Sequence, residues 1–402
     1  MRNLIIKILM RCINYAKKII RKIDKNQTIN IPIIKEKNQI DKQKKLIHIA
    51  AFTYGNAGDA ILPTAVRDSL EIGETSNFNW TGVHAHTTIN DELIAKINQQ
   101  KGVVIGGGGL FLRDTNPNNL SGWQWSCSID SLKKIKVPIA LFAVGYNRFR
   151  GQEDFSSLFK EHVNVLAEKS PFIGLRNHGS IESVKNYIKE ENHYKIKFQP
   201  CPTTIISKLY PILIDAENIE NSKPFIAVNC AFDRSVLRYG QQIGGKLSSI
   251  AKALKKLSND FDIRYYSHVY SDEYFLPYLD CYGIKYQLVK LNNHPRKIIE
   301  LYTTPSLTIG MRGHAQMIPF GCGTPILSIV SHEKMRYFIE DINHPEWGID
   351  INDPNFEVEL YNKAMYILSN QDIIKSEIEA AQQKLFDITN DNVVFIKEKF
   401  KI

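Results

Sequence analysis

Residues 310–325, GMRGHAQMIPFGCGTP, place Arg312 and His314 on either side of one glycine, Gly313. An arginine brings a permanent charge and a planar fork that binds a phosphate or a carboxylate through two parallel hydrogen bonds. A histidine gives or takes a proton near neutral pH, and the glycine between them allows a close turn. The segment therefore predicts an anion site with a candidate general acid or base. The alternative is structural: Arg312 pairs with an acid between two domains, and His314 is a hydrogen-bonded core histidine.

A second arginine, Arg176, ends the apolar run FIGLR and precedes a segment with helical spacing. Arg312 has the equivalent place, after the run LTI and before the apolar segment 315–320. The first amides of a helix are free to bind an anion. Both arginines are therefore well placed for a phosphate or a carboxylate.

The motif GNAGDAILP, at residues 55–63, follows another apolar run. Its glycines, Gly58 among them, allow a tight turn, and the bare amides after Asn56 are suited to an anion. Asp59 lies near the start of the expected helix. A plain turn capped by Asp59 explains the motif equally well.

Four consecutive glycines, residues 106–109, follow the run VVI. Such a run usually indicates close approach of the backbone to a ligand, which makes Gly107 and Gly108 candidate binding positions, and a plain bend is the alternative. The polar loop that follows carries Trp123 and Trp125. Their flat faces suit a sugar ring, and burial as anchors of the loop is an equal alternative.

Apolar runs alternate with segments of helical period from Leu46 onward, which is typical of a parallel α/β sheet. Both arginines fall at the carboxyl ends of expected strands, where ligands bind in such sheets. The sequence predicts two Rossmann-like domains facing a cleft. We expect a first series of strands at 46–54, 103–105, 138–145 and 172–176, and a second at 224–232, 262–269, 284–291, 307–310 and 325–330.

The domain boundary is expected within 208–223, where the composition changes without a clear period. This divides the chain into a leader and linker at 1–45, an N-terminal Rossmann-like domain at 46–215 and a C-terminal one at 216–402. The last of these includes a long helical segment, about 355–400, that we expect to brace the two halves.

The formal net charge of +9 is concentrated at the start of the chain, because residues 1–45 hold 13 of the 51 lysines and arginines and three of the 42 acids. The near-neutral body argues against a nucleic-acid partner. Within residues 1–25, basic residues recur every three or four positions and isoleucines and leucines fill the other side. We expect an amphipathic helix lying on an anionic membrane surface, too short to span it, with packing against the protein or another subunit as the alternative.

The six cysteines form no CxxC pair and no metal-ligand spacing, which is typical of reduced thiols in the cytosol. We therefore expect a cytoplasmic protein associated peripherally with the inner face of the cell membrane.

The order of these motifs resembles that of the polysaccharide pyruvyl transferases: GNAGD, VVIGGGG, the arginine of FIGLRNHGS, and RxH followed by an apolar helix and GTPILSIV. The resemblance extends from about Leu46 to about Tyr337 and leaves the leader outside. It implies a glycosyltransferase-B-like fold and transfer of the enolpyruvyl unit of phosphoenolpyruvate onto two hydroxyls of a sugar, giving a cyclic ketal. Gly313 stands where a leucine is common in the family.

The resemblance also implies roles for single residues. Arg176, Arg312 and His314 would hold the phosphate and carboxylate of the donor, with help from the Gly313 amide. His314 would be the general acid or base, with Asp59 or His332 as its partner. No metal and no cofactor besides the donor substrate is expected. The acceptor would be a sugar of a surface polysaccharide or of its lipid-linked precursor. The resemblance does not assign the loop of Trp123 and Trp125 or the segment 331–336, and the two tryptophans are expected to bind the acceptor because of their flat faces alone. The full expected donor site comprises Arg176, Arg312, Gly313, Asn56, Gly58, Gly107, Gly108 and, outside the family pattern, Lys334.

Two other functions stay open at this level, because a fold alone does not decide function. A glycosyltransferase of the same fold would bind the diphosphate of a nucleotide sugar with Arg312 and Lys334, and the ribose and base with the helix at 331–343. A non-catalytic, membrane-tethered scaffold for polymer assembly would need no charged cleft.

Overall fold

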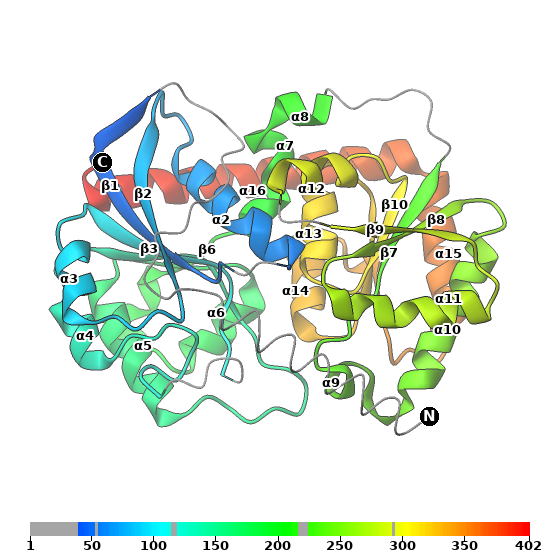
Figure 1. Cartoon of the computed structure of the whole chain (residues 1–402), viewed down its shortest axis with the longest axis horizontal. Coiled ribbons are helices and arrows are strands. Elements are labelled where there is room, and N and C mark those ends of the chain that lie inside the picture. Colours follow the sequence, from blue (N-terminus) through cyan, green and yellow to red (C-terminus); the bar gives the residue numbers. More distant parts are fainter. Residues whose placement is uncertain (1–38, 53–54, 114–118, 216–223, 292–293) are drawn as a thin grey trace.

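The computed structural model describes residues 39–52, 55–113, 119–215, 224–291 and 294–402. They form two parallel six-stranded sheets flanked by helices, which confirms the predicted fold class (Figure 1). The amphipathic helix expected at 1–25 lies outside the described residues. Among the described helices, none combines the length and the apolar character that crossing a membrane requires.

The N-terminal sheet has the strand order β2-β1-β3-β4-β5-β6, so the order reverses between β1 and β3. Sequence reasoning missed two of its strands: β2, in which polar residues interrupt the apolar ones, and β6, which has three residues. The strands are β1 (Ile40–Ala50), β2 (Asn77–His84), β3 (Gly102–Phe111), β4 (Ile139–Tyr146), β5 (Phe172–Leu175) and β6 (Ile196–Phe198).

The C-terminal sheet has the order β12-β11-β10-β7-β8-β9, which is the Rossmann order, and it reverses between β7 and β10. Strand β12 was not predicted. The strands are β7 (Phe225–Asn229), β8 (Asp262–Ser267), β9 (Tyr286–Lys290), β10 (Leu307–Gly310), β11 (Ile326–Val330) and β12 (Gly348–Asp350).

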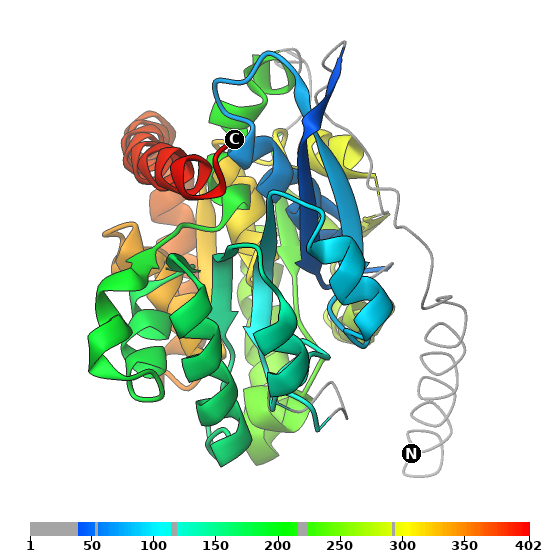
Figure 2. The same ribbon diagram turned by 90° about the vertical axis from the view of Figure 1, so that its left-hand side faces the viewer.

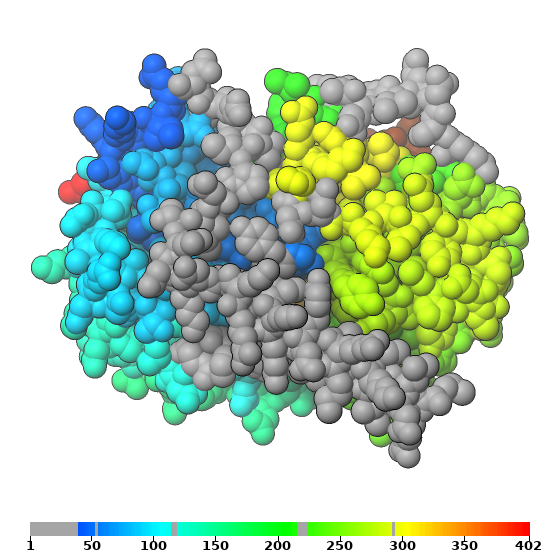
Figure 3. All heavy atoms as spheres, viewed as in Figure 1, coloured from blue at the N-terminus to red at the C-terminus, as the bar shows by residue number. Residues whose placement is uncertain are grey.

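Helices connect successive strands in both halves, which occupy opposite sides of the molecule in the space-filling view (Figure 3). The N-terminal half has α2 (Ala57–Leu70), α3 (Asp91–Ile97), α4 (Ile129–Lys134), α5 (Ser157–Lys169) and α6 (His178–Lys185), followed by α7 (Ile206–Leu209) and α8 (Pro211–Asp215). The C-terminal half has α9 (Ser235–Tyr239), α10 (Ile243–Leu257), α11 (Leu276–Cys281), α12 (Pro295–Tyr302), α13 (His314–Gly321), α14 (Glu333–Asp341) and α15 (Phe356–Ser369).

The last helix, α16 (Gln371–Phe400), runs behind both halves and ends beside the N-terminal sheet (Figures 1 and 2). Near its end, the ammonium of Lys397 lies 2.7 Å from a carboxylate oxygen of Glu74. The ring of Phe400 packs on Gly102, where a Cβ atom would stand 2.4 Å from the ring. Nearer the start of the helix, Gln382 donates to the carbonyl of Phe320 in the C-terminal half, so α16 contacts both halves.

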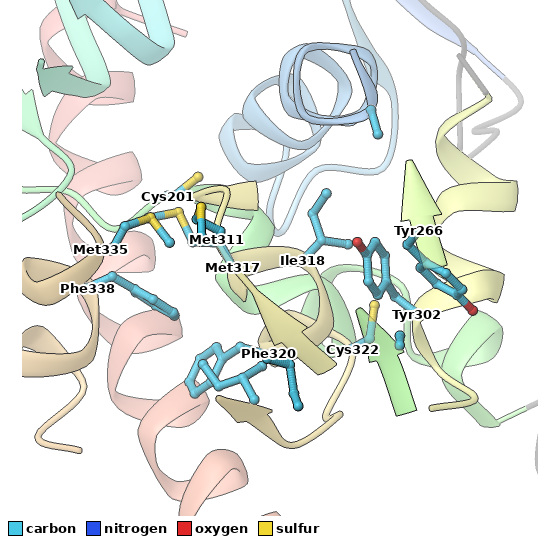
Figure 4. Packing of buried hydrophobic residues seen from close by; sticks show 14 of the residues in the cluster. Cys201, Tyr266, Tyr302, Met311, Met317, Ile318, Phe320, Cys322, Met335 and Phe338 are labelled. Atoms are coloured by element: carbon cyan, nitrogen blue, oxygen red, sulfur yellow. The ribbon is translucent and has the colours of Figure 1, made fainter. Parts of the chain in front are cut away.

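Helix α13 lies between the two halves. Its apolar side chains belong to a buried cluster that also contains Cys201 and Met335 (Figure 4). Gly321 at its end packs so closely that a Cβ atom would stand 1.9 Å from the carbonyl oxygen of Thr203. This close packing fixes the position of α13 and therefore the position of its first residue, His314.

Candidate active site

One pocket of about 330 Å³ lies between the carboxyl ends of the two sheets. Its walls include Ala50 and Gly107, which flank the reversal between β1 and β3, and Asp233 and Arg312, which flank the reversal between β7 and β10. Open parallel sheets bind ligands at such points, because the loops diverge there. The pocket thus lies where the strand order of each sheet reverses.

Arginines and one lysine dominate the charged lining of this pocket, with Asp59 and Asp233 as the acids. Such a surplus of positive charge in a partly closed cleft favours an anionic ligand. The basic residues of the lining are Arg176, Arg234, Arg238, Arg312 and Lys334.

Arg176 has the placement expected of an anion ligand. Its side chain is buried after β5, and Nη2 donates to Oδ1 of Asn147 at 3.0 Å. Its Nε has no hydrogen-bond partner among the described residues. Gly145 leaves the space for the guanidinium, since a Cβ atom there would stand 2.3 Å from Nε. Burial lowers the pKa of Arg176, because the charged guanidinium loses its contact with water. A bound anion would offset this loss of solvation free energy.

Lys334 extends into the pocket from the first turn of α14. Its ammonium lies 6.0 Å from the centroid of the Phe149 ring and makes no hydrogen bond or ion pair with another described residue. Burial and then the charges of Arg176 and Arg238 lower its pKa well below the ordinary value. Lys334 and Arg176 are thus two basic pocket residues that no carboxylate binds directly, and an anion bound beside Lys334 would favour its charged form.

Arg312 also lines the pocket, but unlike Arg176 its guanidinium is paired with carboxylates, and its role as a direct donor ligand stays a prediction. Its Nη1 lies 2.8 Å from Oδ1 of Asp233, and its Nε and Nη2 are bound by the buried carboxylate of Asp272. Burial lowers the pKa of Arg312, but the two carboxylates outweigh it and raise the pKa. The guanidinium fork is therefore occupied within the C-terminal half, and the pairing is not between domains.

His314, the first residue of α13, lies in the pocket with its ring against Gly58. A Cβ atom at Gly58 would stand 2.1 Å from Nδ1, so the glycine makes room for the histidine. Nε2 lies 3.9 Å from Sγ of Cys201. Burial, and then Arg176 and Lys334, lower the pKa of His314 to about 3. The ring is neutral near pH 7, and an anion placed among these cations would raise its pKa.

Gly313 has φ −52° and ψ −48°, which is ordinary helical backbone. A Cβ atom there would meet only the side chain of Lys334, at 3.8 Å. The expectation that a glycine is needed for a close turn is therefore wrong, and a larger residue would fit the same backbone.

Asp59 and Asn56 face His314 from the other half of the pocket. Oδ1 of Asn56 caps α2 by accepting from the Gly58 amide at 3.0 Å, and its Nδ2 donates to Oδ2 of Asp59 at 3.0 Å. Asn56 therefore orients Asp59, besides lining the pocket itself.

The four glycines lie inside β3, and the prediction that they follow a strand is wrong. Gly106 and Gly108 have φ of 146° and 100°, which disfavours other residues. A Cβ atom at Gly109 would stand 1.6 Å from Nδ2 of Asn147. Packing within the protein thus explains part of the run, and Gly107 and Gly108 do line the pocket.

Trp123 and Trp125 do not line the pocket, and their predicted role in sugar binding is corrected. Their exposed fractions are 1% and 0%, and Nε1 of Trp123 donates to Nδ1 of the buried His162 at 3.1 Å. They anchor the loop, because their large apolar rings are more stable in the core. Gln124, between them, reaches the pocket and contacts His86 at 3.2 Å.

His332 was a possible partner of His314, but it lies behind Phe149. The two rings are stacked with centroids 4.0 Å apart, and Phe149 lines the pocket. Sequence reasoning missed Phe149, and it also missed His268 and Asn147, which follow β8 and β4. The positions of His268 and Asn147 at or just after the ends of expected strands could have identified them as pocket residues.

A metal ion has no evident ligand set, since no three histidine, cysteine, aspartate or glutamate side chains of the described residues come together to hold one.

Solved structures share this architecture of two parallel sheets, which is a glycosyltransferase-B-like fold. A putative UDP-N-acetylglucosamine 2-epimerase from Listeria monocytogenes has a TM-score of 0.56 at 14% identity, with 89% of this chain and 97% of that chain covered. The MnaA–UDP co-structure from S. aureus has a TM-score of 0.53 at 14% identity, with the same two coverages of 89% and 97%. At these identities the likeness concerns the fold alone. No curated relative matches the chain.

The chain belongs to the polysaccharide pyruvyl transferase family, whose model matches residues 5–333. It is therefore a transferase, and the family implies a sugar acceptor. The match begins inside the leader, so the expectation that the shared region starts at Leu46 is wrong.

Proposed function

We propose that the protein transfers the enolpyruvyl group of phosphoenolpyruvate onto two hydroxyls of a sugar and forms a pyruvate ketal. The observation that carries the proposal is the placement of Arg176 and Lys334, two basic residues without a bound carboxylate, around His314 in one pocket. Family membership supports the same reaction class.

The charges of the pocket suit a small, highly charged donor. Arg234, Arg238 and Arg312 gather on Asp233, with Asp272 as a second partner of Arg312. Each of these arginines has a carboxylate partner, and because three arginines share two carboxylates, this wall of the pocket keeps a net positive charge. Arg176 and Lys334 are then the groups that bind phosphate and carboxylate, because hydrogen bonds between ionised groups are stronger than neutral ones. The N-terminus of α13, which begins at His314 in the pocket lining, offers further amide donors.

The chemistry needs one proton at carbon and one leaving phosphate. The first sugar hydroxyl adds to C2 of the donor while C3 accepts a proton, which gives a ketal that still carries the phosphate. The second hydroxyl then takes the place of the phosphate at C2, its proton leaves, and inorganic phosphate is released. The sum is donor plus diol to cyclic ketal plus phosphate.

His314 is the proposed acid for C3. It is neutral in the free pocket and becomes easier to protonate once the donor's charge is bound beside it. Asp59, on the facing wall, is the proposed base for the attacking hydroxyl. Arg176 and Lys334 stabilise the charge that grows on the departing phosphate.

The acceptor sugar is proposed to bind the neutral wall of the pocket. His86, Gln124 and Asn147 line this wall on the N-terminal half, and they offer hydrogen bonds without adding a formal charge there. That chemistry suits a polyhydroxylated ring. We propose further that the acceptor belongs to a surface polysaccharide or its lipid-linked precursor, because the basic pattern of residues 1–25 suits an anionic membrane surface on the cytoplasmic side.

The test is phosphate release from phosphoenolpyruvate with a panel of sugar acceptors, beside thermal stabilisation by phosphoenolpyruvate and by UDP-sugars. The proposal predicts stabilisation by phosphoenolpyruvate and acceptor-dependent phosphate release. Stabilisation by a UDP-sugar alone would instead establish a nucleotide-sugar transferase. Lys334→Ala should weaken the stabilisation by phosphoenolpyruvate, whereas the control Lys252→Ala, at an exposed lysine outside the pocket, should not.

A further inference from the structure

His268 follows β8 and lines the pocket, yet none of the steps above uses it. Its side chain is buried, with an exposed fraction of 1%. Nε2 lies 2.5 Å from the hydroxyl of Tyr302, whereas Nδ1 has no hydrogen-bond partner among the described residues. A buried polar atom without a partner is uncommon and requires an explanation, and beside a ligand pocket a bond to the ligand is one such explanation.

Both halves of the molecule hold the backbone of His268. Its amide donates to Oδ2 of Asp272 at 3.1 Å, and its carbonyl accepts from the amide of Ala57, the first residue of α2, at 3.4 Å. Because the two ring nitrogens point away from each other, a bond from Nε2 to Tyr302 leaves Nδ1 on the opposite side of the ring. The ring orientation is therefore defined by the fold.

Tyr302 lies in the core, where its ring packs beside Tyr266 with centroids 5.3 Å apart (Figure 4). The residue has no exposed surface, and burial raises the pKa of its hydroxyl well above the ordinary value. The hydroxyl therefore keeps its proton. Within the described part of the chain, the only acceptor in hydrogen-bond reach is Nε2 of His268.

This arrangement determines the tautomer of His268. If Tyr302 donates to Nε2, the ring proton is on Nδ1. With the opposite tautomer, Nε2 would carry the proton, and the buried phenol proton of Tyr302 would have no acceptor, which is unfavourable. Burial, and then Arg312 and His314, lower the pKa of His268, so the ring stays neutral.

We propose that His268 is a further donor-binding residue, which donates from Nδ1–H to an anionic oxygen of phosphoenolpyruvate, and that Tyr302 is the positioning residue that sets its tautomer. The identity of the anion rests on the proposed function; the tautomer does not. A neutral imidazole can polarise a substrate oxygen without exchanging its proton. His268 would thus bind while the neighbouring His314 transfers a proton.

Two substitutions of His268 separate this role from a packing role. An asparagine amide nitrogen takes the place of Nδ1, whereas a glutamine amide nitrogen takes the place of Nε2. His268→Asn should keep the affinity for phosphoenolpyruvate within about threefold, and His268→Gln should weaken it about tenfold or more, since a bond to a charged oxygen is lost. His162→Asn and His162→Gln, at a buried histidine bonded to Trp123, are the controls and should leave affinity unchanged.

Tyr302→Phe should weaken affinity several-fold, because the ring proton then moves between the two nitrogens. Tyr266→Phe is the matched control: its hydroxyl donates to the carbonyl of Leu301 at 2.9 Å, and its removal should leave affinity unchanged. The tautomer itself is measured by nitrogen NMR of ¹⁵N-histidine-labelled protein, with the His268 signals assigned by their loss in His268→Asn. The expected result is protonated Nδ1 in the wild type and a mixed tautomer in Tyr302→Phe.

Protonated Nε2 in the wild type would overturn the inference, as would equal affinities of the Asn and Gln variants. If the wild type does not bind phosphoenolpyruvate, the proposed function is wrong. The same series with inorganic phosphate as the probe, together with the NMR spectrum, then still decides the role of His268. A difference between Asn and Gln with phosphate supports it, and no difference contradicts it.

Discussion

Asp272 and Arg312 form a buried ion pair in which Nε of Arg312 lies 2.9 Å from each carboxylate oxygen and Nη2 lies 2.6 Å from Oδ1. Oδ2 of Asp272 also accepts from the amide of His268 and from Nδ2 of Asn229. The carboxylate of Asp272 thus connects residues at the carboxyl ends of β7, β8 and β10, next to the pocket. The arginine of the RxH motif is held there as part of the scaffold.

Asp272→Asn should therefore destabilise the protein by about 3–5 kcal/mol, because it leaves the guanidinium buried with one acidic partner lost. Urea unfolding measures the change. Glu273→Gln, whose carboxylate pairs with the exposed Lys290 at 3.0 Å, is the control, with an expected loss below about 1 kcal/mol. A loss at Asp272 no larger than at Glu273 would refute a scaffold role for the pair.

Gly58→Ala should reduce turnover much more than stability. A Cβ atom at this position would stand 2.1 Å from Nδ1 of His314, so the ring must move. A displacement of about 1 Å at a catalytic group costs about 10²-fold in rate. Steady-state phosphate release measures this, with circular dichroism as the folding check. Gly245→Ala, in helix α10 with nothing within 4 Å of the new methyl group, should keep full activity. Normal turnover in Gly58→Ala would mean that the position of His314 is not critical.

Donor binding should take up protons and should strengthen as the pH falls. The pKa of His314 is lowered to about 3 in the free pocket, so the ring is unprotonated across pH 6–8. A bound anion raises that pKa, so the complex holds more protons than the free protein, and lower pH favours it. Calorimetry in buffers of different ionisation enthalpy measures the uptake.

His314→Gln is the matching variant for this measurement. It should lose most of the proton uptake and about 10²-fold or more of the turnover, while it keeps donor binding. If uptake persists unchanged in His314→Gln, the proton goes to another group, with Lys334 as the next to be tested, because its pKa is also lowered.

Much of this architecture could be predicted from the sequence, because buried parallel strands are continuous apolar runs. The strand expected at 307–310 is β10, and the one at 325–330 is β11 to within one residue. Edge strands were harder: β2 carries asparagines and a threonine, so its apolar pattern is weak. The glycine run was misplaced because its contacts are with Leu62 and Asn147, which are distant in sequence.

The site was predicted less completely, because residue type and strand-end position do not reveal partners. Arg176 and Arg312 have the same local pattern, yet Asp272 and Asp233 bind one of them and not the other. Two tryptophans in a polar loop are typical of sugar stacking, but in the structure both rings are buried in the core behind the loop. Those distinctions depend on tertiary packing between distant segments.

Removing residues 1–38 should leave donor binding intact and abolish co-sedimentation with anionic liposomes. The basic side chains at 1–25 provide the attraction in our account, about 1 kcal/mol each near such a surface. The cut precedes β1, which begins at Ile40. Salt should weaken liposome binding of the full chain. If the full-length protein does not co-sediment with anionic liposomes, the leader has a packing or assembly role instead.

Arg176 and Lys334 should together bind phosphoenolpyruvate, and calorimetric titration of this donor into Arg176→Ala, Lys334→Ala and the wild type measures the contribution of each. We expect binding to the wild type and a loss of about 2–4 kcal/mol in each variant, since each removes a charge-assisted contact. Lys252→Ala should bind as the wild type does. Equal affinity in all four proteins, or binding of a UDP-sugar and not of phosphoenolpyruvate, would show that these two residues do not form a phosphoenolpyruvate site.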